Sequence, residues 1–303
     1  MGMTFTSNVL KDGLSRIQRE IDAAFDAQLP VPDDMSASLV EAMRYAAIGG
    51  GKRVRPLLVA SVAELHNGSR EQAVRAGCAI EAIHVYSLIH DDLPCMDDDD
   101  LRHGKPTLHK KYDDAIAVLA GDSLHALAFD LLASPEMSND PAVRAELVHA
   151  LASASGHKGM AGGQVMDIAA EEAGGDLDLH TITRLQQLKT GALLGAAVEM
   201  GAIIGRVPSE GRSHLRNYAR DIGLAFQIAD DLLDVEGDEE AAGKALRKDD
   251  AAGKQTFVTL MGAEQARAQA SALADQAIGH LSAYGSEADI LRELARFIVE
   301  RDR

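Results

Sequence analysis

Residues 84–107 read HVYSLIHDDLPCMDDDDLRHGKPT, and this stretch determines how the rest of the chain is interpreted. Six aspartates fall within residues 91–100, and the apolar residues before them recur at the spacing of a buried helix. Buried carboxylates need a compensating charge, and Mg²⁺ suits them because it takes one or two carboxylates and completes its shell with water and phosphate oxygens. Arg102 and Lys105 follow directly, with the chemistry to bind that phosphate. The alternative is an acidic loop that is simply solvated.

A second acidic cluster lies in residues 226–235, which read FQIADDLLDV. Asp230 and Asp234 are four residues apart, so a helix would present both on one face. Two acidic helices that face each other would repel unless divalent cations and an anionic ligand filled the space between them. The two clusters together therefore predict a metal-bridged polyphosphate site.

These motifs resemble those of the short-chain (E)-isoprenyl diphosphate synthases, most closely the bacterial farnesyl diphosphate synthases. The motifs that carry the resemblance are Asp91-Asp92 followed by Asp97, Arg102 and Gly104, the DDxxD at 230–234, GGKRVRP at 50–56, GGQ at 162–164, Lys189-Thr190, Phe226-Gln227 and Gly253-Lys254. They follow the order and spacing of that family over nearly the whole chain, which makes chance agreement very improbable.

The resemblance implies an all-α fold of the isoprenoid synthase type, a single-domain helical bundle around a central cavity over residues 1–303. It implies a head-to-tail prenyltransferase that condenses isopentenyl diphosphate with dimethylallyl or geranyl diphosphate to give farnesyl diphosphate. About three Mg²⁺ ions and a homodimer are implied with it. Geranyl or geranylgeranyl diphosphate synthases of the same family and a non-catalytic regulatory subunit remain alternatives. A class I terpene cyclase would have no use for a second diphosphate site.

The resemblance also implies roles for individual residues. The implied Mg²⁺ ligands are Asp91, Asp97 and Asp230, and the implied contacts of isopentenyl diphosphate are Lys52, Arg55, His84 and His103. The implied groups around the allylic diphosphate and its reacting carbon are Asp91, Asp92, Arg102, Lys189, Thr190, Gln227, Lys244 and Lys254. His103 departs from the pattern, because the family usually has an arginine there. A histidine lacks the bidentate fork and is only partly charged at neutral pH, which predicts weaker, pH-dependent binding.

Tyr86 and Ser87 are the residues most informative about product length. An allylic chain anchored at Asp91 would run back along the helix, where a residue five positions earlier lies roughly 7.5 Å away at about 1.5 Å per residue. A ring at Tyr86 would then act as a floor, which favours a C15 or C10 product over C20. The Tyr86-Ser87 pair also resembles the C15-type arrangement. The alternative is that Tyr86 packs between helices without touching substrate.

Composition excludes other classes of function. The chain has a net charge of −17 and no Trp, so it offers neither a basic surface nor a stacking set for nucleic acid. No uninterrupted apolar run reaches the ~20 residues of a membrane span, so stable membrane insertion is not expected. Cys78 and Cys95 are the only cysteines, which gives no disulfide framework, fits a reducing cytoplasm and predicts two buried thiols.

Hydrophobic periodicity predicts helices over residues 9–28, 36–47, 112–132, 140–154 and 181–206, and two more within 262–299. The third of these is expected to break near Gly121. Glycines at 49–51 are expected to turn the backbone sharply beside a ligand. The polar segment 236–254 is expected to be a loop that closes over the allylic diphosphate.

Overall fold

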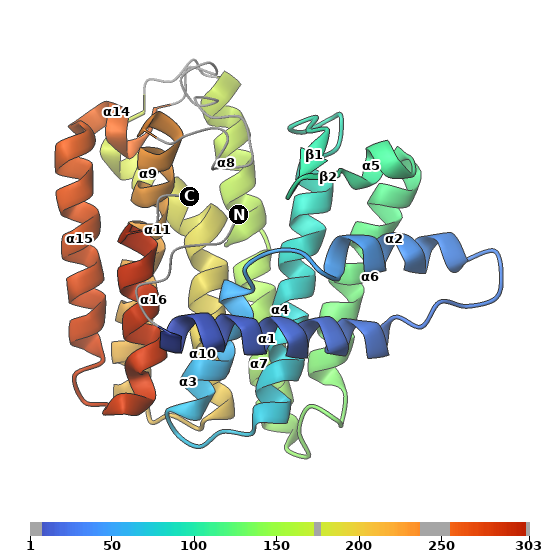
Figure 1. The fold of residues 1–303 in the computed structure, drawn as a ribbon, viewed down its shortest axis with the longest axis horizontal. Coiled ribbons are helices and arrows are strands. Elements are labelled where there is room, and N and C mark those ends of the chain that lie inside the picture. Colours follow the sequence, from blue (N-terminus) through green and yellow to red (C-terminus); the bar gives the residue numbers. More distant parts are fainter. Residues whose placement is uncertain (1–7, 173–176, 237–254, 301–303) are drawn as a thin grey trace.

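Helices form nearly all of the described part of the chain, residues 8–172, 177–236 and 255–300 of the computed structural model (Figure 1). The first half contains α1 (Asn8–Gln28), α2 (Ala37–Ala47), α3 (Val54–Glu64), α4 (Arg70–Asp91), β1 (Leu101–Arg102), β2 (Lys105–Pro106), α5 (Leu108–Lys111), α6 (Asp114–Ala133) and α7 (Pro141–Ser155). The second half contains α8 (Met160–Glu172), α9 (Leu179–Gln186), η1 (Gln187–Gly191), α10 (Ala192–Ile204), α11 (Ser209–Glu236), α14 (Phe257–Met261), α15 (Ala263–His280), η2 (Ser286–Ala288) and α16 (Asp289–Glu300). The predicted all-α bundle is confirmed, since β1 and β2 form only a short antiparallel hairpin.

Helix α4, which ends at Asp91, is held by a cap at its first turn and by packing against two other helices. The Ser69 side chain caps its first turn by accepting a hydrogen bond from the Gln72 N–H, and Pro94 follows its end. Ile80 and Ile83 are fully buried, because α4 packs against both α3 and α6. Packing against two helices therefore fixes the direction of α4, and with it the position of Asp91 at its C-terminal end.

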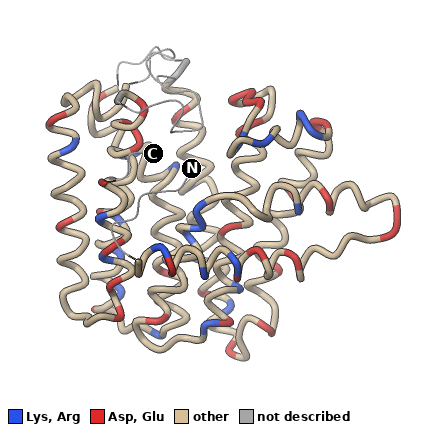
Figure 2. Tube along the Cα trace, viewed as in Figure 1, with Lys and Arg blue, Asp and Glu red and all other residues tan. Residues whose placement is uncertain are grey.

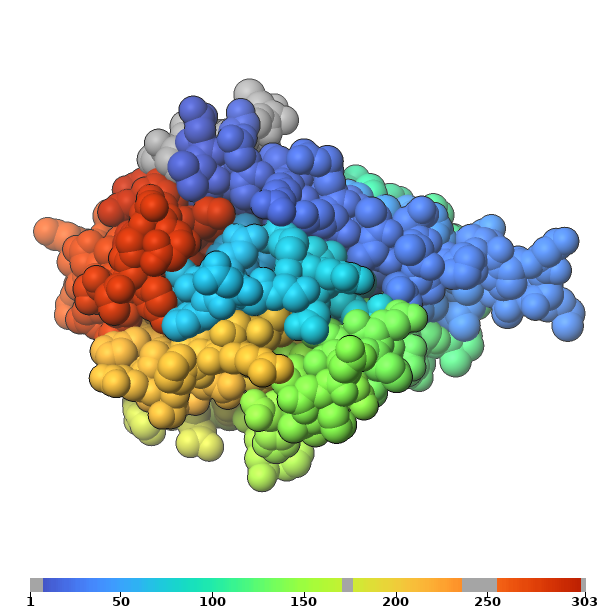
Figure 3. Space-filling model, turned by 90° about the horizontal axis from the view of Figure 1, so that it is seen from below, coloured from blue at the N-terminus to red at the C-terminus, as the bar shows by residue number. Residues whose placement is uncertain are grey.

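One hydrophobic core joins α1 to α16. Seen from below, α1 lies along one edge of the molecule, α4 begins in the middle, and the segment after α1 projects from the body (Figure 3). The interpretation of residues 1–303 as one domain stays a prediction.

The predicted break near Gly121 is wrong, because α6 runs unbroken through it. One glycine costs a helix only about 1 kcal/mol relative to alanine, which packing on both sides offsets. Its missing side chain has a use here. A Cβ at Gly121 would lie 2.1 Å from His90 Nε2, so the glycine leaves room for the His90 ring.

The predicted helix over 181–206 is confirmed as an uninterrupted helical segment over 179–204, but the π-helical turn within it was not predicted. The chain forms α9, then a π turn at Gln187–Gly191, then α10. Such π turns occur frequently at functional sites. Lys189 and Thr190 lie within this turn.

Two further expectations from the sequence concern membrane insertion and the burial of both cysteines. α6 is the one helix, among the described residues, that is long and apolar enough to cross a membrane on length and composition; it packs against α2, α4 and α5. Cys78 is buried, and burial raises the pKa of its thiol to about 12. Cys95 is exposed, contrary to prediction, because the chain leaves the core at Pro94.

The C-terminal ends of α4 and α11 lie at the same end of the bundle, together with α8 and the hairpin (Figure 1). Acidic residues gather in the loop that follows α4, at this same end (Figure 2). The fold therefore brings both acidic motifs to one end of the molecule.

Candidate active site

Asp91 is the last residue of α4 and is half-buried among like charges. Burial raises the pKa of its carboxyl to about 6; the charge of Lys189 opposes this, and the carboxylates of Asp97 and Asp92 add to it. The positive charge of Lys189, which lies in the π turn, therefore acts on the carboxyl at the end of α4. A bound divalent cation would stabilise the ionised form of this carboxyl and offset the effect of burial.

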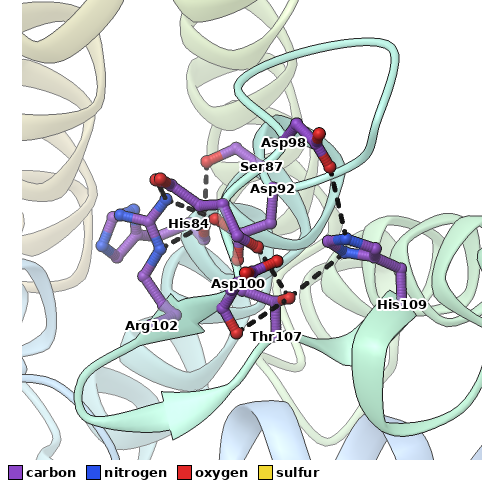
Figure 4. A network of polar contacts seen from close by, with 9 residues as sticks. His84, Ser87, Asp92, Asp98, Asp100, Arg102, Thr107 and His109 are labelled. Carbon is purple, nitrogen blue, oxygen red and sulfur yellow. Dashed lines mark hydrogen bonds and ion pairs between the residues drawn. The ribbon is translucent and has the colours of Figure 1, made fainter.

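Asp92 is 3% exposed and serves a different purpose. Its Oδ1 accepts a hydrogen bond from Arg102 Nε at 3.0 Å and a second from Arg102 Nη2, which also donates to Asp99 Oδ2 at 3.3 Å (Figure 4). The hairpin turn presents Arg102, with φ of 53° at His103 and 74° at Gly104. Arg102, expected at the allylic diphosphate, is therefore paired with and oriented by Asp92 and Asp99.

The glycine-rich turn before α3 is confirmed as sharp, with φ of 75° at Gly49 and 73° at Gly51. A buried arginine that the sequence analysis missed fixes it. Arg53 donates to Asp22 Oδ1 at 2.8 Å and to Glu81 Oε1 at 2.9 Å. These partners come from α1 and α4, so no local sequence signal could have identified the pair.

His84 lies within a cluster of positive charge. Burial lowers the pKa of its imidazole well below 6.5, and the charges of Arg55, His103, Arg53 and Arg102 lower it further. The structure thus brings together three of the four residues predicted to contact isopentenyl diphosphate. A concentration of cationic groups of this kind attracts an anionic ligand.

Arg55 and Lys52 differ from each other in burial and in their contacts. Burial lowers the pKa of Arg55, although the charge of Glu81 opposes it, and the buried Arg55 Nε has no hydrogen-bond partner in the described chain. An orphaned buried donor fits a site that an anion completes. Lys52 is exposed, and its Nζ lies 5.9 Å from the centre of the Phe297 ring.

A pocket opens between α2, the glycine-rich turn, α4 and the hairpin. The residues that line it include the polar His84, Arg102, His103 and Thr107 as well as Tyr45 and Val85. His84 and His103 therefore share one hollow, whereas Lys52 and Arg55 lie outside the set of residues that line it.

The π turn is held in place by α8. Lys189 Nζ donates to Asp167 Oδ2 at 2.6 Å. Gly163 lies directly against the turn, because a Cβ there would be 2.2 Å from the backbone nitrogen of Lys189. The sequence motif identified Lys189 and Thr190 but gave no sign of the turn that presents them.

Gln227 lies on α11, close to the π turn. It is 8% exposed and lines a second pocket together with Gln187 and Gly191. Gln227 and the π turn therefore border one hollow, and the shared role of Gln227 and Thr190 stays a prediction.

The second acidic motif lies near the end of α11. Asp230 and Asp234 are both half-buried. Asp231 is buried, and its Oδ2 accepts a hydrogen bond from the Phe257 N–H at 2.8 Å. Asp231 therefore joins α11 to α14, a structural role that the sequence analysis did not assign.

The donor set fits Mg²⁺. The described residues contain no group of three or more His, Cys, Asp or Glu side chains that could hold a metal alone. Mg²⁺ does not require one, because it binds one or two carboxylates and takes its other ligands from water and substrate phosphate. Asp91 suits this cation, since burial and its acidic neighbours disfavour its ionised form until positive charge arrives. The assignment of Asp91, Asp97 and Asp230 as ligands stays a prediction.

Comparison with known proteins identifies the family. Residues 36–294 match the model of the polyprenyl synthetase family. The chain belongs to this family. Farnesyl diphosphate synthase of Bacillus subtilis is 40% identical, with 98% of each chain covered, and that of Escherichia coli is 43% identical, with 92% of this chain and 93% of the relative covered. The crystal structure of an FPP/GFPP synthase from Zymomonas mobilis matches with a TM-score of 0.88 and 59% identity, covering 96% of this chain and 98% of that one.

In this polyprenyl synthetase, Tyr86 packs between α4 and α6. Its ring meets those of His90 and His125 edge-on, with centroids 5.7 and 5.0 Å apart, and Phe129 lies 5.2 Å beyond His125. Ser87 Oγ donates to the backbone oxygen of His84 at 2.8 Å. The role of Tyr86 and Ser87 in setting chain length stays a prediction.

Two predicted contacts of the allylic diphosphate, Lys244 and Lys254, lie outside the described residues. So does nearly all of the expected loop over residues 236–254, of which the structure describes only the end of α11.

Proposed function

We propose that this polyprenyl synthetase is a farnesyl diphosphate synthase, which joins isopentenyl diphosphate to dimethylallyl diphosphate and then to geranyl diphosphate. The observation that carries the proposal is the cationic cluster around His84 at the same end of the bundle as the acidic site around Asp91. A diphosphate without metal needs cationic side chains, and one with metal needs carboxylates. Two such sites suit two diphosphate substrates, whereas a terpene cyclase would need one.

Each group in these sites has a role in the proposed reaction. Arg55, His84 and His103, with Lys52, hold isopentenyl diphosphate so that its double bond faces the allylic carbon. Oxygen atoms of Thr190 and Gln227 face the carbon on which positive charge develops as the C–O bond ionises. The double bond attacks this cation, and loss of a proton regenerates an allylic product.

The departing diphosphate needs charge neutralisation rather than a protein nucleophile. Mg²⁺ held by Asp91, Asp97 and Asp230 supplies that neutralisation when bound. Lys189 adds a positive charge from the opposite side, and Asp167 holds its ammonium in reach of Asp91. The departing diphosphate can accept the proton that the product loses.

Three further features belong to the proposal. Mg²⁺ dependence is supported by the raised pKa of Asp91. A homodimer is supported by apolar side chains on α6, where Val118 is 40% and Leu119 50% exposed, because a second copy would cover them. A cytoplasmic location is supported by the free thiols of Cys78 and Cys95.

Sizing the reaction product tests the proposed function. The protein would be incubated with Mg²⁺, isopentenyl diphosphate and either dimethylallyl or geranyl diphosphate, and the products dephosphorylated and measured by mass spectrometry. We expect C15 from both starters. A product of C10, or of C20 and longer, would assign a different synthase of the same family. Turnover of geranyl diphosphate alone to a hydrocarbon would indicate a cyclase, and no turnover of any starter would indicate a non-catalytic subunit.

Replacement of the Tyr86 ring should lengthen the product. In Tyr86→Ala we expect the main product to shift from C15 to C20 or longer, because the chain can pass between α4 and α6 once the ring is gone. Mass spectrometry of the dephosphorylated products measures this. Tyr284→Ala, a half-buried tyrosine beside His66 and far from Asp91 in sequence, is the control for general loss of packing. Unchanged C15 in Tyr86→Ala would mean that Tyr86 only packs between helices.

The pH dependence of isopentenyl diphosphate binding should follow from His103. Burial lowers the pKa of His103, the charges of Arg102 and Arg53 lower it further, and Asp92 and Glu81 oppose them. The imidazole is therefore mostly neutral at pH 7 and gains charge only as the pH falls. In His103→Arg, which stays charged, we expect a KM for isopentenyl diphosphate about tenfold lower at pH 8.

The comparison of the two proteins between about pH 6 and 8.5 isolates this effect. Titration of the substrate itself is common to both, and so is the neighbouring His84, whose pKa burial and nearby positive charges lower well below 6.5. The advantage of His103→Arg should shrink as the pH falls toward 6. Equal KM values at every pH would show that residue 103 does not contact the diphosphate.

A further inference from the structure

The acidic loop between α4 and β1 is tied to the helix that precedes it. The N–H of Asp97 donates to the backbone oxygen of Asp91 at 2.8 Å, and the N–H of Asp98 donates to that of Leu93 at 3.2 Å. Asp98 has a φ of 48°, in the left-handed region that aspartate enters more readily than most residues other than glycine. The first half of the loop thus has one defined path.

The second half of the loop is tied to the segment that follows the hairpin. The Thr107 N–H donates to the backbone oxygen of Asp100 at 3.0 Å, and Thr107 Oγ1 donates to that of Asp99 at 2.8 Å (Figure 4). Thr107 Oγ1 also lies 3.2 Å from His109 Nδ1. The hydroxyl has one proton, which the bond to Asp99 uses, so its oxygen accepts a hydrogen bond from His109 Nδ1–H. His109 therefore orients the hydroxyl that holds the loop.

Burial of His109 costs free energy that burial of an apolar side chain of similar size would not. Its side chain is 3% exposed, and its Nε2 has no hydrogen-bond partner in the described chain, with the nearest carboxylate oxygen, on Asp98, 3.9 Å away. A buried polar atom without a partner costs about 1–3 kcal/mol, which an apolar ring of similar size would avoid. A function for the polar ring at this position accounts for that cost.

We propose that Thr107 and His109 are positioning residues, which fix the path of the acidic loop and thereby set how tightly the site binds Mg²⁺. Asp97 belongs to the first set of hydrogen bonds and is joined through Asp98 to residues 99–100, which the second set holds. A displacement of residues 99–100 is therefore transmitted through Asp98 to the backbone that carries the Asp97 carboxylate. The hydrogen bonds of Thr107 and His109 go to the loop and to each other; Thr107 also borders the pocket shared by His84 and His103, whereas His109 does not line it. The inference rests on the proposed function, because it takes Asp97 as a ligand.

Binding of Mn²⁺ without turnover tests this inference. Free Mn²⁺ would be followed by electron paramagnetic resonance in the presence of an unreactive geranyl thiodiphosphate, and the half-saturating Mg²⁺ concentration would be measured in the assay. Thr107→Val and His109→Phe, which keep the volume and lose the polar atoms, should weaken Mn²⁺ binding about 10- to 100-fold. In His109→Phe, which lies outside the pocket of His84 and His103, the KM for isopentenyl diphosphate should change less than about twofold. Thr107→Ser, which keeps the hydroxyl, should restore wild-type Mn²⁺ affinity.

A control within the same segment separates loop positioning from charge. Lys110 Nζ pairs with Asp100 Oδ1 at 2.9 Å, but both side chains are exposed, so Lys110→Ala should leave Mn²⁺ affinity unchanged. Wild-type affinity in Thr107→Val, no rescue by Thr107→Ser, or equal weakening in Lys110→Ala would each overturn the inference. Should His109→Phe fail to fold, the isosteric Thr107→Val decides the question. No Mn²⁺ binding by the wild-type protein would overturn the proposed function as well.

Discussion

Asp91→Asn should lower kcat at least about a thousandfold at saturating Mg²⁺ and substrates, without lowering the midpoint of thermal unfolding. The loss in rate follows because a neutral amide cannot hold the cation against the departing diphosphate, and three powers of ten correspond to about 4 kcal/mol in the barrier. The unchanged stability follows from burial, which raises the pKa of Asp91 to about 6. At pH 7.5 the carboxyl is mainly ionised, but its ionised form costs more free energy in the metal-free fold than in the unfolded chain, and asparagine removes that penalty.

Asp100→Asn is the matched control for this substitution. Asp100 belongs to the same acidic stretch, but its side chain is 75% exposed, and within the described residues its carboxylate pairs with the exposed Lys110 alone. We expect kcat within about threefold of wild type, as for other exposed ion pairs. If Asp91→Asn kept more than about a tenth of wild-type kcat, or if both variants lost activity equally, Asp91 would not be a ligand essential to ionisation. Thermal unfolding monitored by circular dichroism at pH 7.5 measures the effect of each substitution on the unfolding midpoint.

The parts of the fold that depend on local pattern were predictable. Apolar periodicity located α1, α2, α4 and α7, because each helix buries one defined face or is buried on several sides. The glycines at 49 and 51 also predicted their own geometry, since both adopt the left-handed conformation that other residues resist. These features depend on residues that are close together in the sequence, so one sequence is enough to predict them.

The parts that failed depend on residues far apart in the chain. Nothing near Gly121 shows that the His90 ring will occupy the space beside it, so a helix-weakening glycine was mistaken for a break. Arg53 is fixed by Asp22 and Glu81, which belong to two other helices. The roles of the site residues came from the resemblance to a known family, and periodicity alone would have assigned several of them to solvent.

The π turn is the clearest case of this kind, and Gly163→Ala should show what it contributes. The added Cβ would lie 2.2 Å from the nitrogen and 2.6 Å from the Cα of Lys189. Backbone atoms cannot rotate away as a side chain can, so either α8 or the π turn must move. We expect kcat to fall about a hundredfold, the usual effect of a 1 Å displacement at reacting groups. Overpacking should also cost about 1–3 kcal/mol of unfolding free energy.

Gly279→Ala on α15 is the matched control, because a Cβ there meets nothing within 4 Å. This variant should be as stable as wild type or slightly more stable, since alanine favours a helix by up to about 1 kcal/mol over glycine. Single-turnover kinetics with geranyl diphosphate, combined with thermal unfolding, separates the two effects of Gly163→Ala. A lower unfolding midpoint with wild-type kcat would show that Lys189 and Thr190 do not need the observed turn. An unchanged midpoint and an unchanged kcat would instead contradict the close approach of α8, because two backbones in contact leave no room for a methyl group.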